Sequence, residues 1–79
     1  IEAQSIVVES GAQFWHDVLN WCIREGEGTE KERGILRAAA AMPSKLPSSK
    51  QSMILVDLMA RLRKSGCPHR LRSRRRPRD

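Results

Sequence analysis

The residues best suited to chemistry in this sequence are arginines gathered near its end. The chain has 79 residues, with 15 Lys and Arg against 9 Asp and Glu, and six of the arginines fall between positions 70 and 78. A guanidinium is always charged, and its forked N–H groups match phosphate oxygens. We therefore expect this run to hold DNA or RNA through phosphates, without reading the base sequence; a solvated terminus or a targeting signal is the alternative. The arginines of the run are Arg70, Arg72, Arg74, Arg75, Arg76 and Arg78.

Charge is divided unevenly over the rest of the chain. Residues 1–32 carry seven acidic and two basic side chains, whereas residues 33–66 carry one acidic and seven basic ones. Such asymmetry favours an anionic partner for the second half of the chain. The bases before the terminal run that we expect to add phosphate contacts are Arg33, Arg37, Lys50, Arg61 and Lys64.

No group of residues has the spacing of an active site or a metal site. The candidate zinc ligands would be His16, Cys22, Cys67 and His69, but they form neither a C-x2-C nor an H-x3-H pair. The glycines form no phosphate-binding loop. We predict a protein that is not an enzyme, holds no metal and needs no cofactor.

Three segments carry the spacing of a helix-capping box, in which a Ser or Thr is followed three residues later by Glu or Gln. Each precedes a stretch whose apolar residues recur with a helical period. A helix-breaking residue follows each stretch, namely Gly26, Pro43 and Gly66. The three boxes are Ser10–Gln13, Thr29–Glu32 and Ser48–Gln51. The predicted helices span residues 11–25, 30–41 and 49–64.

These elements predict an all-α fold, a small three-helix domain over residues 10–66. We assign residues 1–9 to an N-terminal arm, in which residues 6–8 form either extended chain or an extra helical turn. Residues 67–79 are assigned to an Arg-rich tail that is disordered when free. Because the chain begins at Ile1 rather than Met, we expect it to be part of a longer or processed protein.

All the Phe and Trp residues of the chain, Phe14, Trp15 and Trp21, lie in the first predicted helix. Together with its other apolar residues they cover about 200° of the helical wheel. That arc is wider than one neighbouring helix can cover, so this helix is either central in the domain or partly at an interface. We expect the three aromatic residues to contact a protein partner, with a place in the core as the alternative.

The composition favours an intracellular protein, cytoplasmic or nuclear if the source is eukaryotic. Two cysteines, Cys22 and Cys67, are too few for a disulfide scaffold. No run of about 18 apolar residues is present, so no membrane span is expected. The leading hypothesis is a non-catalytic nucleic-acid-binding accessory module that docks on a protein partner or on its parent chain. The alternative is a protein–protein adaptor, assembly subunit or inhibitor whose bases meet an acidic protein surface; the sequence does not indicate an oligomeric state.

Overall fold

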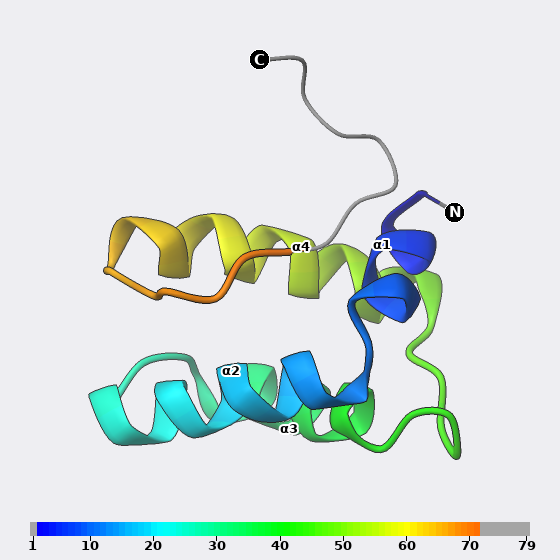
Figure 1. The fold of residues 1–79 in the computed structure, drawn as a ribbon, viewed down its shortest axis with the longest axis horizontal. Coiled ribbons are helices and arrows are strands. Elements are labelled where there is room, and N and C mark those ends of the chain that lie inside the picture. Colours follow the sequence, from blue (N-terminus) through cyan, green and yellow to red (C-terminus); the bar gives the residue numbers. More distant parts are fainter. Residues whose placement is uncertain (1, 72–79) are drawn as a thin grey trace.

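The computed structural model describes residues 2–71, which form four helices and no strand (Figure 1). The all-α prediction is therefore confirmed. The second, third and fourth helices agree with the three predicted ones to within one residue at each end. The first helix was not predicted. The helices are α1 (Glu2–Ser10), α2 (Ala12–Glu25), α3 (Glu30–Ala40) and α4 (Ser49–Lys64).

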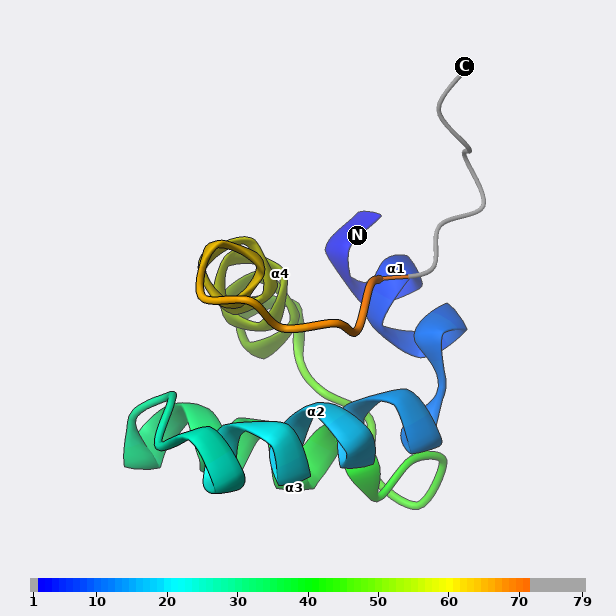
Figure 2. The ribbon, with the colours of Figure 1, turned by 60° about the vertical axis from the view of Figure 1, so that its left-hand side comes forward.

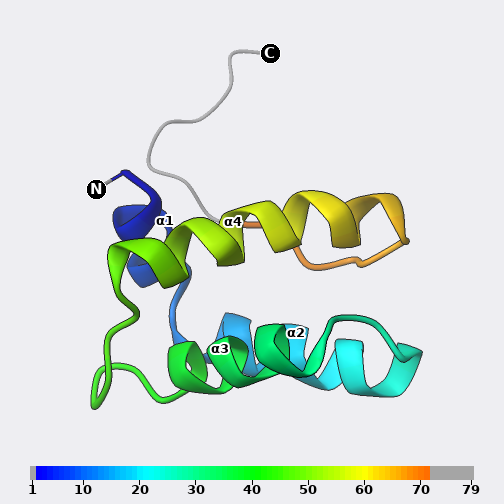
Figure 3. The ribbon, with the colours of Figure 1, turned by 180° about the vertical axis from the view of Figure 1, so that it is seen from behind.

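The helices are arranged in two layers. α2 and α3 form an antiparallel hairpin and lie side by side in one layer (Figures 1 and 2). α4 and the short α1 form the second layer, and the view from behind shows α4 running along the hairpin with α1 near its beginning (Figure 3). The hydrophobic core fills the space between the layers.

Two of the predicted capping boxes are present. At the start of α3, the Thr29 hydroxyl accepts from the main-chain N–H of Glu32 at 3.1 Å, and the Glu32 carboxylate accepts from the N–H of Thr29 at 2.9 Å. Ser48 and Gln51 repeat this exchange at the start of α4, with distances of 3.1 and 3.0 Å. Each box satisfies main-chain donors that have no partner within the helix.

The third predicted box, at Ser10 and Gln13, is wrong. Ser10 is the last residue of α1, and its hydroxyl donates to the carbonyl of Ile6 at 2.9 Å. The residue before α2 is Gly11, which makes no side-chain cap and has φ +88° and ψ 155°. That conformation is open essentially to glycine alone. Gly11 therefore turns the chain between two helices where the sequence pattern indicated a single helix start.

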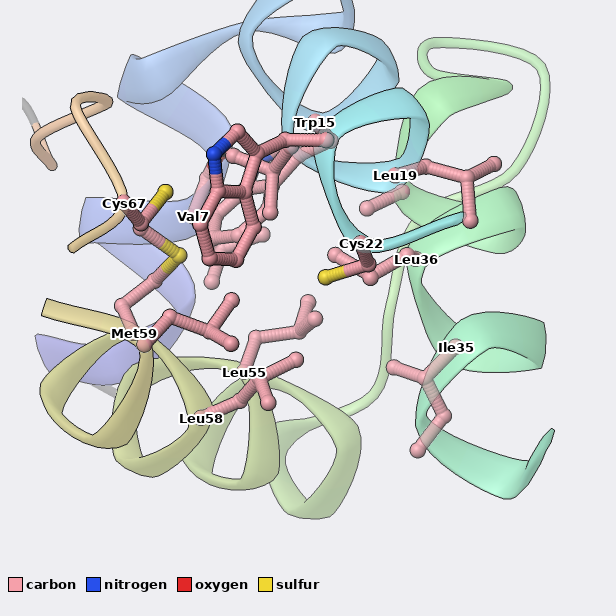
Figure 4. Close-up of a cluster of buried hydrophobic side chains, with 14 residues drawn as sticks. Val7, Trp15, Leu19, Cys22, Ile35, Leu36, Leu55, Leu58, Met59 and Cys67 are labelled. Atoms are coloured by element: carbon pink, nitrogen blue, oxygen red, sulfur yellow. The ribbon is translucent and has the colours of Figure 1, made fainter. Parts of the chain in front are cut away.

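The core draws side chains from all four helices (Figure 4). α1 contributes Val7, which is fully buried, so the segment assigned to an arm is a helical part of the folded body. The remaining buried apolar residues are Trp15, Val18, Leu19, Trp21 and Cys22 of α2; Ile35, Leu36 and Ala39 of α3; Leu55, Leu58, Met59 and Leu62 of α4; and Cys67.

The chain reverses after α4 and runs back beside that helix toward α1 (Figures 2 and 3). Gly66, at φ +99°, makes the reversal, and the N–H of Cys67 donates to the carbonyl of Leu62 at 3.0 Å. Cys67 is buried and Leu71 packs against the core. Residues 67–71 therefore belong to the folded body rather than to the tail, and the predicted disorder of residues 72–79 lies outside the described residues.

Candidate nucleic-acid interface

The predicted phosphate-binding residues do not share one surface. Arg37 lies on α3 opposite the buried Ile35, Leu36 and Ala39 of that helix, and therefore faces away from the core. Lys50 and Lys64 are exposed at the two ends of α4, about 21 Å apart along the axis at the standard rise per residue. These three positions therefore lie on two helices and toward opposite ends of one of them.

Arg33 has a structural role. Its guanidinium donates to the Glu27 carbonyl at 3.1 and 2.9 Å and to the Cys22 carbonyl at 3.3 Å. These carbonyls lie at and just after the C-terminus of α2. The Cys22 carbonyl also accepts from the main-chain N–H groups of Gly26 and Glu27, so Arg33 adds to the cap that ends the helix. The side chain is half-buried. Arg33 therefore ties α3 to the end of α2, whereas its contact with nucleic acid stays a prediction.

Arg61 is also engaged within the body. Its guanidinium pairs with Glu32, so the ion pair joins α4 to α3. This hydrogen bond is the main cause that holds the pKa of Glu32 below its usual value, and the contact with Thr29 adds to it. The pair in turn raises the pKa of Arg61. Lys64 lines a pocket together with Arg61 and the acidic Glu27, so the bases on this side of α4 face acidic groups.

A different group of bases meets on the other side of α4. Arg63, His69 and Arg70 surround a pocket of about 290 Å³, which we call the α4 pocket. Its apolar lining, which we call the floor, is formed by Val56, Met59 and Ala60 of α4 and by Leu71 of the returning chain. Among residues 2–71, neither Arg63 nor Arg70 has an acidic partner within salt-bridge distance. The α4 pocket thus combines two uncompensated guanidiniums with an apolar floor.

Three rings connect this pocket to the core. Phe14 packs edge-on against Trp15, with ring centroids 4.7 Å apart, and edge-on toward His69 at 6.4 Å. Such T-shaped contacts are favourable between aromatic rings. Phe14, itself half-buried, therefore positions His69 at the rim.

The two tryptophans that we assigned to a protein interface lie in the core instead. Trp15 has no exposed surface and Trp21 only 7%. Neither is available to a partner while the domain is folded, because both fill the space between the layers. The large apolar side chain that α2 does expose is Ile23, at 51%.

Of the residues around the α4 pocket, only Arg70 was among the predicted sites. Arg63 follows Val56 and Ala60 at helical spacing, so a search for a base beside an exposed apolar stripe would have found it. Nothing in the sequence indicates His69, because its place depends on the reversal of the chain at Gly66 and on contact with a residue 55 positions earlier, Phe14.

Other kinds of site find little support in the described part of the chain. Within residues 2–71, no three or more His, Cys, Asp and Glu residues are grouped so that they could hold a metal ion. Cys22 and Cys67 are free and buried. Burial, with the nearby Cys67 as a second cause, raises the pKa of Cys22 to about 11. None of the four helices is long and apolar enough to cross a membrane.

The α4 pocket brings Arg63 and Arg70 together at its basic rim, and neither has an acidic partner among residues 2–71. The arginines from Arg72 to Arg78 follow this rim directly in the sequence. Comparison with protein-family profiles, with curated protein sequences and with solved structures finds no match to this chain.

Proposed function

We propose that this chain is a non-catalytic module that binds DNA or RNA through phosphate contacts. The observation that carries the proposal is the meeting of Arg63 and Arg70 at one rim without acidic partners among the described residues. A guanidinium left without a carboxylate is available to a phosphate. The module would act inside the cell, where nucleic acid is found.

The arginine run adds to this rim. Leu71 packs against the core, so the chain enters the run from a defined place beside Arg63. Arg72, Arg74, Arg75, Arg76 and Arg78 would then extend the phosphate contacts along the backbone of the nucleic acid. Of the bases in the middle of the chain, Lys50 and Lys64 remain candidates for weaker contacts, whereas Arg33 and Arg61 are engaged within the body.

A protein adaptor is the competing function, and one observation favours it. Met53 is 60% exposed on α4, on the same helical face as Val56 and Ala60, so an acidic protein with apolar side chains would also find complementary groups here. A protein partner would then dock on this face of α4 rather than on the aromatic residues of α2.

The test is the binding of labelled oligonucleotides, measured by fluorescence anisotropy at several salt concentrations. Affinity should fall steeply with salt, by about 0.9 log unit per phosphate contact per log unit of salt on duplex DNA. The double variant Arg63→Gln/Arg70→Gln should show a shallower slope and weaker binding. Arg37 was predicted to contact phosphate, but it lies exposed on α3 and does not line the α4 pocket, so the proposal leaves it out. Arg37→Gln is therefore the matched control and should bind like the parent.

Deletion of residues 72–79 tests the contribution of the run. It should weaken binding about tenfold or more at moderate salt, because five arginines are lost. Oligonucleotide binding that is absent at low salt, or that does not depend on salt, would contradict the proposed function. Binding of an acidic protein alone would favour the adaptor.

A further inference from the structure

The floor of the α4 pocket is more apolar than phosphate binding requires. Phosphates need only the charged rim, yet Val56, Met59, Ala60 and Leu71 create an apolar surface beneath it. The volume of about 290 Å³ lies near the lower limit of pockets that hold small ligands, about 300 Å³. That size suits one flat heterocycle.

We infer that the α4 pocket receives an unpaired nucleobase, so that the module prefers single-stranded to duplex nucleic acid; this inference rests on the proposed function. A base has two apolar faces and a polar edge. Its face would lie against Met59 and Leu71, while Arg63 and Arg70 hold the phosphates on either side. Guanidinium planes and imidazole rings stack on unpaired bases in many single-strand complexes, and both types of group are present at this rim.

The position of the floor explains why the base must be unpaired. It is formed by α4 and by Leu71 of the returning segment, and it shares the pocket with Arg63, His69 and Arg70. A base in a duplex is stacked on both faces and offers only its edge to a protein. Duplex would therefore reach the rim through its phosphates and leave the floor uncovered, whereas a single strand can turn a base inward.

The contacts between the rings of Trp15, Phe14 and His69 also favour a nucleobase in the pocket. His69 is held at the rim by Phe14, which itself packs against the buried Trp15. A ring fixed in this way loses little conformational freedom when it stacks on a ligand. The pocket wall contributed by residues 69–71 is thus tied to the core.

The experiment compares three probes of equal length on the full chain: a single-stranded oligonucleotide, the same backbone carrying abasic sites, and a duplex. The abasic probe keeps the phosphates and removes the bases. The intact single strand should bind about tenfold more tightly than the abasic probe, an effect at the lower end of what one stacked base contributes. The abasic probe and the duplex should bind only through phosphate contacts, so that their affinity falls with salt and has no contribution from a base.

The variant Ala60→Leu fills the α4 pocket and so tests whether the preference for the intact strand arises there. Ala60 is exposed on α4, and Ala and Leu both favour helix, so the substitution should leave the fold intact. It should abolish the preference for the intact strand over the abasic probe without changing abasic binding, because Arg63 and Arg70 remain. Ala41→Leu, an exposed site at the end of α3, is the matched control and should retain the preference.

The possible outcomes separate the two proposals. Equal, salt-dependent affinities for intact and abasic probes would overturn the base-binding inference and leave the proposed function standing. A preference for the intact strand that survives in Ala60→Leu would place the base elsewhere and also overturn the inference. If no probe binds, while a polyglutamate peptide does, both proposals are wrong.

Discussion

The indole N–H of Trp15 on α2 donates a hydrogen bond to the main-chain carbonyl of Val7 on α1, with a distance of 3.0 Å, inside the core. In a longer helix that carbonyl would accept from the N–H four residues on. Here the N–H of Gly11 instead donates to Val8 at 3.2 Å, because α1 ends at Ser10. Trp15 therefore satisfies a buried acceptor that the end of α1 leaves without a helical partner.

Replacing Trp15 should cost more stability than replacing the other tryptophan. Trp15→Phe removes the donor to Val7, and an unsatisfied buried carbonyl costs about 1–3 kcal/mol. Trp21→Phe is the matched control, since Trp21 makes no side-chain hydrogen bond among the described residues and is slightly exposed. Urea unfolding followed by far-UV circular dichroism measures both. Equal losses of unfolding free energy would show that the hydrogen bond to Val7 contributes nothing.

The Glu32–Arg61 pair should stabilise the fold in a pH-dependent way. The pKa of Glu32 is lower in the folded chain than in the unfolded chain, mainly because of the hydrogen bond from Arg61. The stabilisation is therefore complete above the ordinary glutamate pKa and is lost as the pH falls through the lowered value. Arg61→Gln should lower the urea midpoint at neutral pH and have little effect once Glu32 is protonated.

Arg63→Gln is the control for this measurement, because Arg63 lies on the same helix and has no acidic partner among residues 2–71. Its urea midpoint should follow that of the parent at both pH values. A deficit in Arg61→Gln that persists unchanged in acid would exclude the ion pair as its cause.

Arg33 and Arg37 should differ in the same experiment. Arg33→Gln removes donors from the carbonyls of Glu27 and Cys22, which should lower the unfolding free energy by about 1–2 kcal/mol. Arg37 is exposed and makes no such contact, so Arg37→Gln should be close to neutral. If both variants unfold at the same urea concentration, Arg33 does not stabilise the end of α2.

Cys22 should be protected from alkylation in the folded chain. Burial raises its pKa from 9.0 to about 11, and the thiolate is the reactive form. Below pH 9 the thiol is protonated in both the folded and the unfolded chain, so it does not change the free energy of unfolding. As the pH rises from 9 toward 11 the thiol ionises first in the unfolded chain, so the free energy of unfolding should fall. Iodoacetamide labelling with peptide mapping should show slow modification of Cys22 at pH 8 without urea and fast modification in urea. Equal rates would mean that the thiol is accessible in the native state.

Ser52 should be replaceable with a gain in stability. Its hydroxyl is fully buried on α4, and no hydrogen-bond partner for it is found among the described residues. Ser52→Ala removes this unpaired group and introduces a better helix former, so the unfolding free energy should rise by about 1 kcal/mol. Ser5→Ala, at an exposed position of α1, is the control and should change stability less. A loss of stability in Ser52→Ala would show that the hydroxyl is paired in solution.

Local signals in the sequence were sufficient for α2, α3 and α4. Capping boxes at Thr29 and Ser48 involve residues only three positions apart, so they depend little on the rest of the fold. The apolar period then identified the stretches that form these helices. Ser10 shows the limit of this approach, since the same pattern occurs there by chance and the turn is made by Gly11.

Contacts between distant residues were decided by the tertiary structure alone. Arg33 and Arg61 look like the other bases in the sequence, but folding brings the main-chain carbonyl of Glu27 to Arg33 and the carboxylate of Glu32 to Arg61, so both guanidiniums are engaged within the body. Arg63 and Arg70 have no acidic partner among residues 2–71, and the reversal at Gly66 brings them to one pocket. The sequence thus determined α2, α3, α4 and the total charge, whereas the place of α1 in the core depended on contacts with distant residues. Which charges stay available to a ligand depended on how the two layers pack.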